Sequence, residues 1–295
     1  MRDKLRKFLF DESQVYGQIV EIYQTWDQIQ KNNSCPEIVT NILGEMISAS
    51  ILLSANLKFD GKIIIQIYGD GPIKFLTAEC DSKLRVRATV KISKKNKISE
   101  NTSFDKLLNT KGKGRLIITL EPKNNNLKQK TYQSMVELIG DSISKILENY
   151  MLVSAQLETK FWLAANKNVT KGLLLQKMPE TNEINQQKLS DPDLWERTVK
   201  IADSLKKKEL LETNIEKILE KLYWNEAVRV FNLRFPTFFC SCSKAKVHNM
   251  IKILGEKELQ PNILKNKNLN INCEYCGKKY VITSHELKII FSKDM

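Results

Sequence analysis

The sequence predicts an α+β protein with a mixed strand-and-helix N-terminal core domain, a helical linker and a small cysteine-rich C-terminal domain. Three observations support this division. Short β-branched runs alternate with apolar helical stretches through the first part of the chain. A polar stretch and two helix starts follow, and the remaining residues hold two closely spaced cysteine pairs. We therefore expect domains over residues 1–179, 180–235 and 236–295.

The chain is long enough to bury a core of ordinary size together with a satellite domain. Its most apolar stretch, Ile38–Leu57, contains Glu45 and several polar residues, so it fits a buried helix better than a membrane span. The first residues, Met1–Lys4, lack the apolar run and small-residue cleavage site of a signal peptide. We therefore expect a cytoplasmic protein without a membrane partner, in a compartment where thiols stay reduced.

The core domain is expected to begin with a strand over Gln14–Thr25 and a helix over Pro36–Ala55. The helix is apolar nearly all round, which is typical of a buried helix. Lys62–Tyr68 is rich in β-branched residues and predicts a strand. It leads through the turn Gly69–Pro72 into another strand, Ile73–Ala78.

The second half of the core domain is also expected to mix strands and helices. Leu84–Val90 alternates at period two and predicts a strand with one solvated face. Gly114–Leu120 predicts a strand that stops before Pro122. An amphipathic helix is expected over Met135–Tyr150. Two short strands complete the domain, Phe161–Ala165 and Gly172–Met178.

The linker begins with a polar stretch, Thr181–Ser190. Asp191 followed by Pro192 predicts a helix with Asp191 as its N-cap. Thr213–Glu216 has the pattern of a capping box with Thr213 as cap. The apolar residues that follow lie at helical spacing: Ile215, Ile218, Leu219, Leu222 and Tyr223. Since this segment has no core of its own, we expect it to fold on a neighbouring surface and to open easily.

The strongest functional signal is a pair of thiol motifs, C-x-C at Cys240 and Cys242 and C-x-x-C at Cys273 and Cys276. Two close pairs on either side of a long gap supply four ligands for one tetrahedral ion, and four thiolates at about 2.3 Å close the shell of Zn²⁺. Gly277 can take a positive φ angle and turn the backbone toward the metal. We expect these cysteines to bind Zn²⁺ in the reduced protein, in preference to forming two structural disulfides.

The other motifs predict no catalytic site. Gly69–Pro72 lacks the lysine and Ser/Thr of a P-loop and is interpreted as a tight turn. His248, six residues after the C-x-C motif, is an alternative metal ligand, and His285 is expected on an exposed helix. Cys35 and Cys80 are isolated, neither belongs to a C-x-x-C pair, and Cys35 is expected to be a lone, partly buried thiol. We therefore expect no catalytic residues and no enzyme activity.

The four-thiolate site would carry a formal charge of −2, which nearby lysines would offset: Lys244, Lys246, Lys278 and Lys279. Metal binding would contribute about 10–16 kcal/mol to the folding of a domain with few large apolar side chains. An oxidant converts a thiolate to a sulfenic acid, and a neighbouring thiol then closes a disulfide. Each pair supplies such a neighbour, so oxidation would remove the ligands and release whatever the metal-bound fold holds in place.

Two other functions are considered. The formal net charge of +13 suggests a zinc-dependent nucleic-acid-binding protein. The charge is +9 over residues 1–179, −1 over 180–235 and +5 over 236–295, without a dense arginine cluster, which fits a drift in composition better. A thiol–disulfide oxidoreductase using Cys273 and Cys276 would need a thioredoxin-like βαβ unit, which this region lacks.

Several segments resemble a known family over nearly the full chain. The most specific are Phe238–Ser243 and Cys273–Gly277, which contain the thiol motifs. The others are Leu57–Gly61, Gly69–Pro72, Gly172–Gln176 with Met178–Pro179, and Leu222–Tyr223. On these residues the chain resembles the 33 kDa redox-regulated heat-shock chaperonins, which are bacterial holdases.

The resemblance implies an ATP-independent chaperone that is inactive when reduced and zinc-bound, with a small C-terminal zinc-binding redox-switch domain. It implies that oxidation forms the disulfides Cys240–Cys242 and Cys273–Cys276, releases zinc and unfolds the linker. The protein, as a homodimer, would then bind unfolding or oxidatively damaged clients and prevent their aggregation. The chain departs from the family pattern in its basic balance, at Ala245, and at Lys171, which replaces the first of two glycines. Both substitutions are expected to alter packing of the switch domain.

Overall fold

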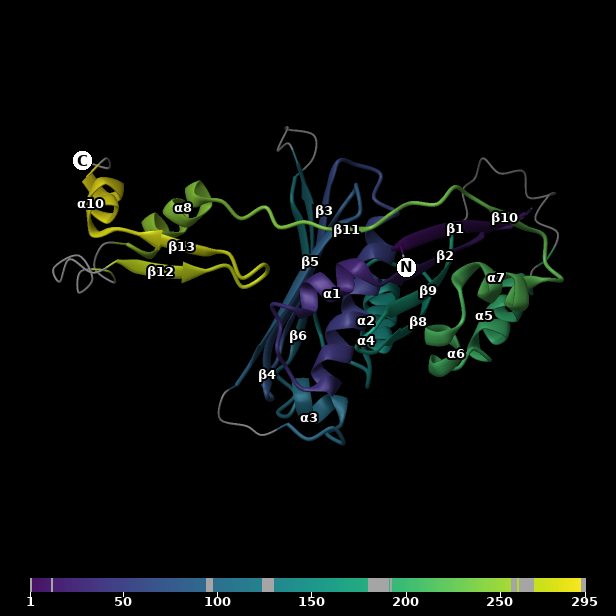
Figure 1. The fold of residues 1–295 in the computed structure, drawn as a ribbon. Helices are drawn as coiled ribbons and strands as arrows, with labels where there is room; N and C mark the ends of the chain where they lie inside the picture. Colours follow the sequence, from purple (N-terminus) through teal and green to yellow (C-terminus); the bar gives the residue numbers. More distant parts are fainter. Residues whose placement is uncertain are drawn as a thin grey trace. The chain divides into compact units, whose positions relative to one another are not determined.

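A computed structural model describes residues 2–11, 13–93, 98–123, 130–179, 191, 193–255, 259 and 268–292. The chain divides into two compact units, Met1–Phe238 and Phe239–Met295. Strands and helices are mixed in both units, which confirms the predicted α+β class (Figure 1).

The first unit contains a five-stranded antiparallel sheet in the order β10-β1-β2-β9-β8. Its strands are β1 (Lys4–Phe10), β2 (Val15–Ile22), β8 (Thr159–Ala165), β9 (Thr170–Lys177) and β10 (Val228–Val230). The strands predicted near β2, β8 and β9 are confirmed. Strand β1 was not predicted, because Lys4, Arg6 and Lys7 interrupt its apolar alternation.

A second, six-stranded sheet has the order β11-β5-β4-β3-β6-β7. Only β11 pairs in parallel, with β5; the other neighbours are antiparallel. The strands predicted at β3, β4, β5 and β6 are confirmed, and Pro122 is the last residue of β6. The strands are β3 (Gly61–Tyr68), β4 (Ile73–Asp81), β5 (Arg85–Ile92), β6 (Arg115–Pro122), β7 (Tyr132–Glu137) and β11 (Thr237–Phe238).

Helix α2 (Glu37–Ser54) packs against both sheets and is the centre of the main apolar cluster. Within the described part of the chain it is the one helix long and apolar enough to cross a membrane, but 72% of its apolar window is buried inside the protein. The prediction of a buried core helix is therefore confirmed. Three shorter helices complete the core: α1 (Gln24–Gln30), α3 (Phe104–Leu108) and α4 (Ile143–Val153).

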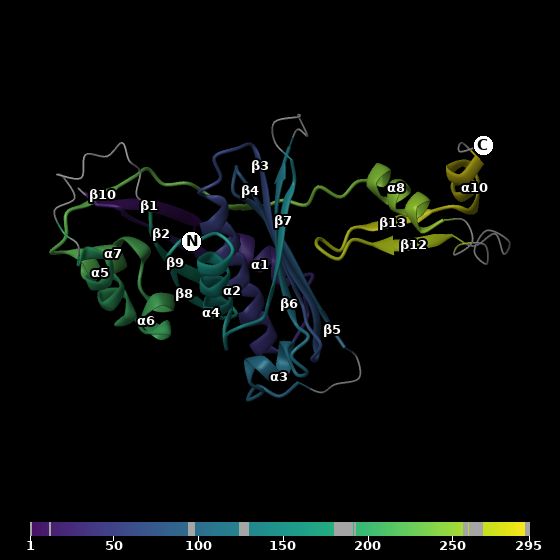
Figure 2. The same cartoon turned by 180° about the vertical axis from the view of Figure 1, so that it is seen from behind.

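The helix predicted over Met135–Tyr150 is wrong in its first half. Residues Tyr132–Glu137 form the edge strand β7, seen in Figure 2, and the helix α4 begins only at Ile143. Gly140 adopts φ +131°, and the Ser142 hydroxyl caps α4 by accepting from the backbone N–H of Lys145. Apolar spacing alone concealed this break, because the exposed and half-buried side chains of β7 extend the helical pattern.

Three linker helices follow the core: α5 (Leu194–Asp203), α6 (Lys207–Glu212) and α7 (Ile215–Tyr223). The predicted N-caps are wrong. Asp193 is the N-cap of α5, and the Asp191 carboxylate instead accepts from the N–H of Asp193 at 3.1 Å. Asn214, not Thr213, caps α7 by accepting from the N–H of Glu216. Pro192 and the predicted loop Thr181–Ser190 lie outside the described residues.

The linker helices pack on the face of the five-stranded sheet that points away from α2, here called the outer face (Figure 1). All five residues of the predicted α7 stripe are buried there. The Tyr223 ring meets the Phe10 ring edge-on, with centroids 5.0 Å apart. The sheet side chains in this cluster, here called the docking cluster, are Phe8, Phe10, Val15, Ile19, Ala164, Leu173 and Leu175. The segment predicted to lack a core of its own thus packs on the outer face of the five-stranded sheet.

The second unit is small. Its elements are α8 (Lys244–Leu254), the hairpin β12 (Leu269–Asn272) and β13 (Lys279–Ile282), and α10 (Ser284–Ser292). Among its described residues, the buried apolar side chains of this unit are Val247, Ile251, Tyr280, Ile282, Leu287 and Ile290. So small a cluster gives little hydrophobic stabilisation, because a short chain buries a low fraction of its surface.

Candidate metal centre

The first cysteine arm lies between β11 and α8. Cys240 and Cys242 precede Ser243, whose hydroxyl caps α8 by accepting from the N–H of Lys246 at 3.2 Å. The cap ends the extended backbone directly after Cys242 and begins the helix there. The C-x-C arm is therefore fixed on one side by a helix start.

The second arm lies in the turn between β12 and β13. The N–H of Cys273 donates to the carbonyl of Lys278 at 2.9 Å, and the N–H of Gly277 donates to the carbonyl of Cys273 at 2.8 Å. Gly277 has φ +68°, as expected from its place after Cys276. This left-handed conformation closes the turn so that both thiols of the arm face the same side.

The four thiols meet. The Sγ atoms of Cys240 and Cys273 are 3.7 Å apart, and those of Cys242 and Cys276 are 3.4 Å apart. All four Sγ atoms lie within 4.8 Å of one another. A tetrahedral Zn²⁺ with bonds of about 2.3 Å needs sulfur atoms about 3.8 Å apart, so the thiols fit such an ion in both number and spacing.

Tyr280 completes the site and was not identified from the sequence. Its hydroxyl donates to the Sγ atom of Cys242 at 3.0 Å. Burial opposes ionisation of Cys242, but hydrogen bonds from Tyr280 and the neighbouring thiols outweigh it and lower the pKa of Cys242 to about 7. The same bond raises the pKa of Tyr280 to about 12, which keeps it a donor at neutral pH. Burial raises the pKa of Cys276 to about 12.

The lysines near the thiols make varied contacts. Lys244 pairs with Glu286 on α10, and Lys246 donates to the hydroxyl of Ser241 at 2.9 Å. The ammonium of Lys278 lies 5.4 Å from the centre of the Tyr280 ring. Of the four lysines expected to offset the thiolate charge, Lys244 thus joins α8 to α10, whereas Lys246 and Lys278 make local contacts beside the thiols.

The other predicted positions lie apart from this group. Among the described residues, the four cysteines are the one cluster of His, Cys, Asp or Glu able to hold a metal, so His248 is not part of it. His285 is exposed on α10, as expected. Cys35 is half-buried, whereas Cys80 is fully buried and burial raises its pKa to about 12. Asp70 accepts from the N–H groups of Lys111 and Lys113, which supports a structural turn.

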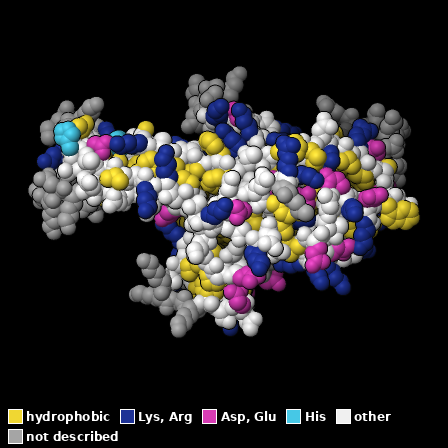
Figure 3. Space-filling view, in the orientation of Figure 1, with side chains coloured by type: hydrophobic (Ala, Val, Ile, Leu, Met, Phe, Trp, Pro, Cys, Tyr) yellow, Lys and Arg dark blue, Asp and Glu magenta, His cyan; other side chains and the backbone are white. Residues whose placement is uncertain are grey.

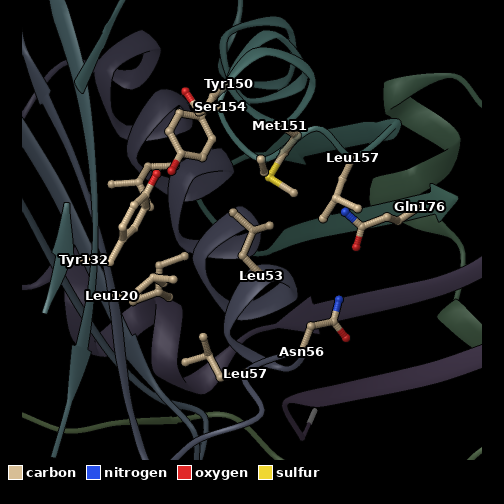
Figure 4. Close-up of a pocket in the computed structure, with 13 residues that line it drawn as sticks. Leu53, Asn56, Leu57, Leu120, Tyr132, Tyr150, Met151, Ser154, Leu157 and Gln176 are labelled. Atoms are coloured by element: carbon tan, nitrogen blue, oxygen red, sulfur yellow. The ribbon is translucent and has the colours of Figure 1, made fainter. Parts of the chain in front are cut away.

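The core also contains a cavity of about 340 Å³ between α2, α4 and the strands β6 and β7 (Figure 4). Apolar side chains such as Leu53, Leu120 and Met151 line most of it, and the side chains of Asn56 and Gln176 lie at one end. None of the sequence-predicted site residues lines this cavity. It therefore adds nothing to the thiol chemistry.

Comparisons with known proteins agree on one family. The family described as Hsp33 protein matches residues 3–283. A 33 kDa chaperonin of Chromobacterium violaceum is 37% identical over 99% of this chain and 95% of its own. A 33 kDa chaperonin of Methylobacillus flagellatus is 34% identical over 99% and 96%. The crystal structure of a 33 kDa chaperonin from Thermotoga maritima has the same fold, with a TM-score of 0.78, 20% identity and 99% of both chains covered.

Proposed function

The chain belongs to the Hsp33 family and is a redox-regulated chaperone, and we propose that its four clustered cysteines form the switch that releases the linker. We propose that the chain consists of a core over residues 1–179, a linker over 180–235 and a switch domain over 236–295. The observation that carries it is the meeting of two cysteine arms whose Sγ atoms lie within 4.8 Å. This arrangement offers an oxidant four thiols at once.

In the reduced protein, Cys240, Cys242, Cys273 and Cys276 would hold Zn²⁺. The metal supplies a closed tetrahedral link between the two arms, which the small apolar cluster of this unit cannot replace. The Tyr280 hydroxyl would fix the orientation of the Cys242 thiolate by donating to its Sγ atom. The chain's own residues thus support both the ligands and their geometry.

Oxidation would convert the ligands into disulfides. A thiolate attacks peroxide and becomes a sulfenic acid with release of hydroxide; a neighbouring thiol then forms the S–S bond and water leaves. The paired Sγ contacts, 3.7 and 3.4 Å, run between the arms. We nevertheless propose the pairs Cys240–Cys242 and Cys273–Cys276, because each arm keeps its own resolving thiol beside the oxidised one once the arms separate.

Loss of the metal-bound fold would free the linker at its C-terminal end. Release of α5, α6 and α7 would uncover the docking cluster on β1, β2 and β9 together with the apolar face of α7. A large exposed apolar surface binds other apolar chains, and unfolding proteins expose such chains. Client proteins would therefore be held by apolar contact, without ATP and without catalysis.

We further propose that the active form is a homodimer in the cytoplasm. Support comes from the resemblance to bacterial chaperonins. The nucleic-acid hypothesis is not favoured, because the relatives are chaperones. On the face seen in Figure 3, moreover, lysine and arginine side chains are interspersed with acidic ones.

The proposal is tested by suppression of aggregation of a thermally unfolding client, with zinc content followed in the same samples. We expect no suppression by the reduced protein, and strong suppression after peroxide and mild heat, together with zinc loss. Cys35→Ser is the matched control, since this half-buried thiol lies outside the cluster and its loss should leave the switch intact. Zinc release without any suppression would contradict the proposal.

A further inference from the structure

Two buried charges lie on the outer face of the five-stranded sheet, where the linker docks. The side chains of Lys171 on β9 and Glu21 on β2 are only 1% and 3% exposed, and Nζ lies 3.1 Å from Oε2. The two residues are opposite each other in the antiparallel register. Leu173 and Ile19, two positions away on the same strands, belong to the docking cluster, so the pair faces the linker as well.

Lys171 also reaches the linker directly. Its ammonium donates to the backbone carbonyl of Thr213 at 2.8 Å. Thr213 is the C-cap residue of α6 and directly precedes Asn214, the N-cap of α7. The contact therefore joins the core to the junction between two linker helices, and places a cation at the carbonyl end of α6.

A rim of charged side chains surrounds this buried pair. Lys4 of β1 lies 3.5 Å from Glu21 and 3.8 Å from Glu216 of α7. Arg6 of β1 lies 3.5 Å from the other carboxylate oxygen of Glu216. The network thus runs from the core strands across to the first turn of α7.

Burying a charge pair is costly unless both partners remain. Burial lowers the pKa of Lys171, and Glu21 opposes that effect. Removing Glu21 leaves the buried ammonium of Lys171 without its nearest counter-ion, whereas removing Lys171 leaves Glu21 with Lys4 at 3.5 Å. Removing both partners of a buried pair is often neutral or stabilising. Such a pair fixes the position of a docked segment more than it tightens the docking.

We propose that Lys171 is a positioning residue that fixes the α6–α7 junction of the linker on the core, with Glu21 as its counter-ion. The packing that Lys171 affects is therefore that of the linker, which corrects the expectation that it alters the switch domain. Ala245 lies in the first turn of α8 and is exposed. This inference rests on the proposed function only where it links linker release to activation.

The test is a double-mutant cycle on the full, reduced, metal-loaded chain, read by hydrogen–deuterium exchange of residues 193–223. Glu21→Gln should increase exchange in the linker at least tenfold, and Lys171→Met should increase it less, because Lys4 still lies 3.5 Å from Glu21 in that variant. The double variant K171M/E21Q should recover most of the protection, because no buried charge remains. Lys217→Met, at an exposed position of α7, is the matched control and should leave exchange unchanged.

Exchange in α2 serves as the reference for the fold of the core. If K171M also raises exchange in α2, that substitution has disturbed the core. The near-isosteric E21Q and the double variant then show whether the buried charges affect exchange in the linker. Singles as protected as the wild type, or a double variant whose effect equals the sum of the singles, would overturn the inference. Failure of the proposed function looks different: the cycle would show coupling while oxidised wild type leaves client aggregation unchanged.

Discussion

The two faces of the five-stranded sheet are packed in different ways. The inner face meets α2, a helix buried nearly all round, with Leu43, Met46 and Ile47 fully inaccessible. The outer face meets helices with a single apolar stripe, and it includes the buried pair Lys171 and Glu21. One sheet thus carries a continuous apolar core on one side and a partly charged docking surface on the other.

This difference fits the proposal that the linker can be released while the core stays folded. The inner face gains from a large apolar area, so its opening requires global unfolding. The buried carboxylate of Glu45 on α2 keeps a counter-ion, because Lys207 of α6 lies 2.9 Å from it. On the outer face, the charges would regain water if the linker were released, which would offset part of the lost apolar burial. The predictions below separate the two faces, starting with the largest expected effect.

Removing the metal should have the largest effect, and this effect should be confined to the second unit. Cys273→Ser, or treatment of the reduced protein with a strong chelator, removes a contribution of about 10–16 kcal/mol. We expect residues 239–255 and 268–292 to lose exchange protection while α2 keeps it. Equal loss of protection in α2 would mean that the core depends on the metal.

Matched isoleucine truncations should distinguish the two faces. Ile47 of the core helix α2 and Ile218 of α7 on the outer face are 0% and 2% exposed, so each change to Ala costs about 2–5 kcal/mol. Ile47→Ala should lower the free energy of global unfolding. Ile218→Ala should mainly destabilise the docked linker, and so allow suppression of aggregation at lower oxidant concentration.

Denaturant unfolding monitored at the core, together with exchange in residues 193–223, measures both effects. If Ile218→Ala lowers the free energy of core unfolding as much as Ile47→Ala does, the two faces do not differ in the way proposed.

A backbone substitution should weaken the second arm alone. Gly277 has φ +68°, a conformation that costs a residue with a Cβ atom about 1–2 kcal/mol. Gly277→Ala should therefore reduce zinc affinity about tenfold in a competition titration with a chromophoric chelator. Gly112→Ala is the control, since this glycine also has a positive φ but lies in the core unit. Unchanged zinc affinity in Gly277→Ala would show that the turn does not position the thiols.

The smallest expected effect is on pH dependence. Burial lowers the pKa of Lys171 below 10.5 when the linker is docked. Between this lowered pKa and 10.5, the docked state therefore binds fewer protons than the released state. Docking should therefore strengthen as pH rises toward 10.5. Tyr223 acts in the opposite direction above about pH 10, because burial raises its pKa.

Exchange corrected for its intrinsic pH dependence, in wild type and Lys171→Met, measures this effect. The variant should show a flatter profile. The charged or titratable groups near Lys171 are Lys4, Arg6, Glu21, Tyr23 and Glu216. Identical profiles would show that Lys171 does not titrate differently on docking.

Local patterns predicted much of this molecule. The apolar run of α2, the β-branched strands and the α7 stripe are encoded within single elements, and periodicity identifies them. The thiol motifs predicted the cluster because spacing alone constrains four ligands. The helix expected over Met135–Tyr150 failed because a strand and a helix met across Gly140 with similar apolar spacing.

Features that depend on distant residues were not predicted. The contact of Tyr280 with Cys242 joins residues 38 positions apart through a hairpin register. Lys171 was identified only as a departure from the family pattern, since its partner Glu21 lies on another strand. Long-range pairing, not local propensity, decides such contacts.

The central claim is that thiol oxidation releases the linker from the outer face while the inner face stays packed. The most direct measurement is exchange of residues 193–223 and of α2 during a peroxide titration, with client aggregation assayed in the same samples. We predict that linker protection falls in step with thiol loss, that α2 protection stays constant, and that suppression of aggregation rises with linker exposure. Full thiol oxidation and full suppression with a still-protected linker would contradict the account.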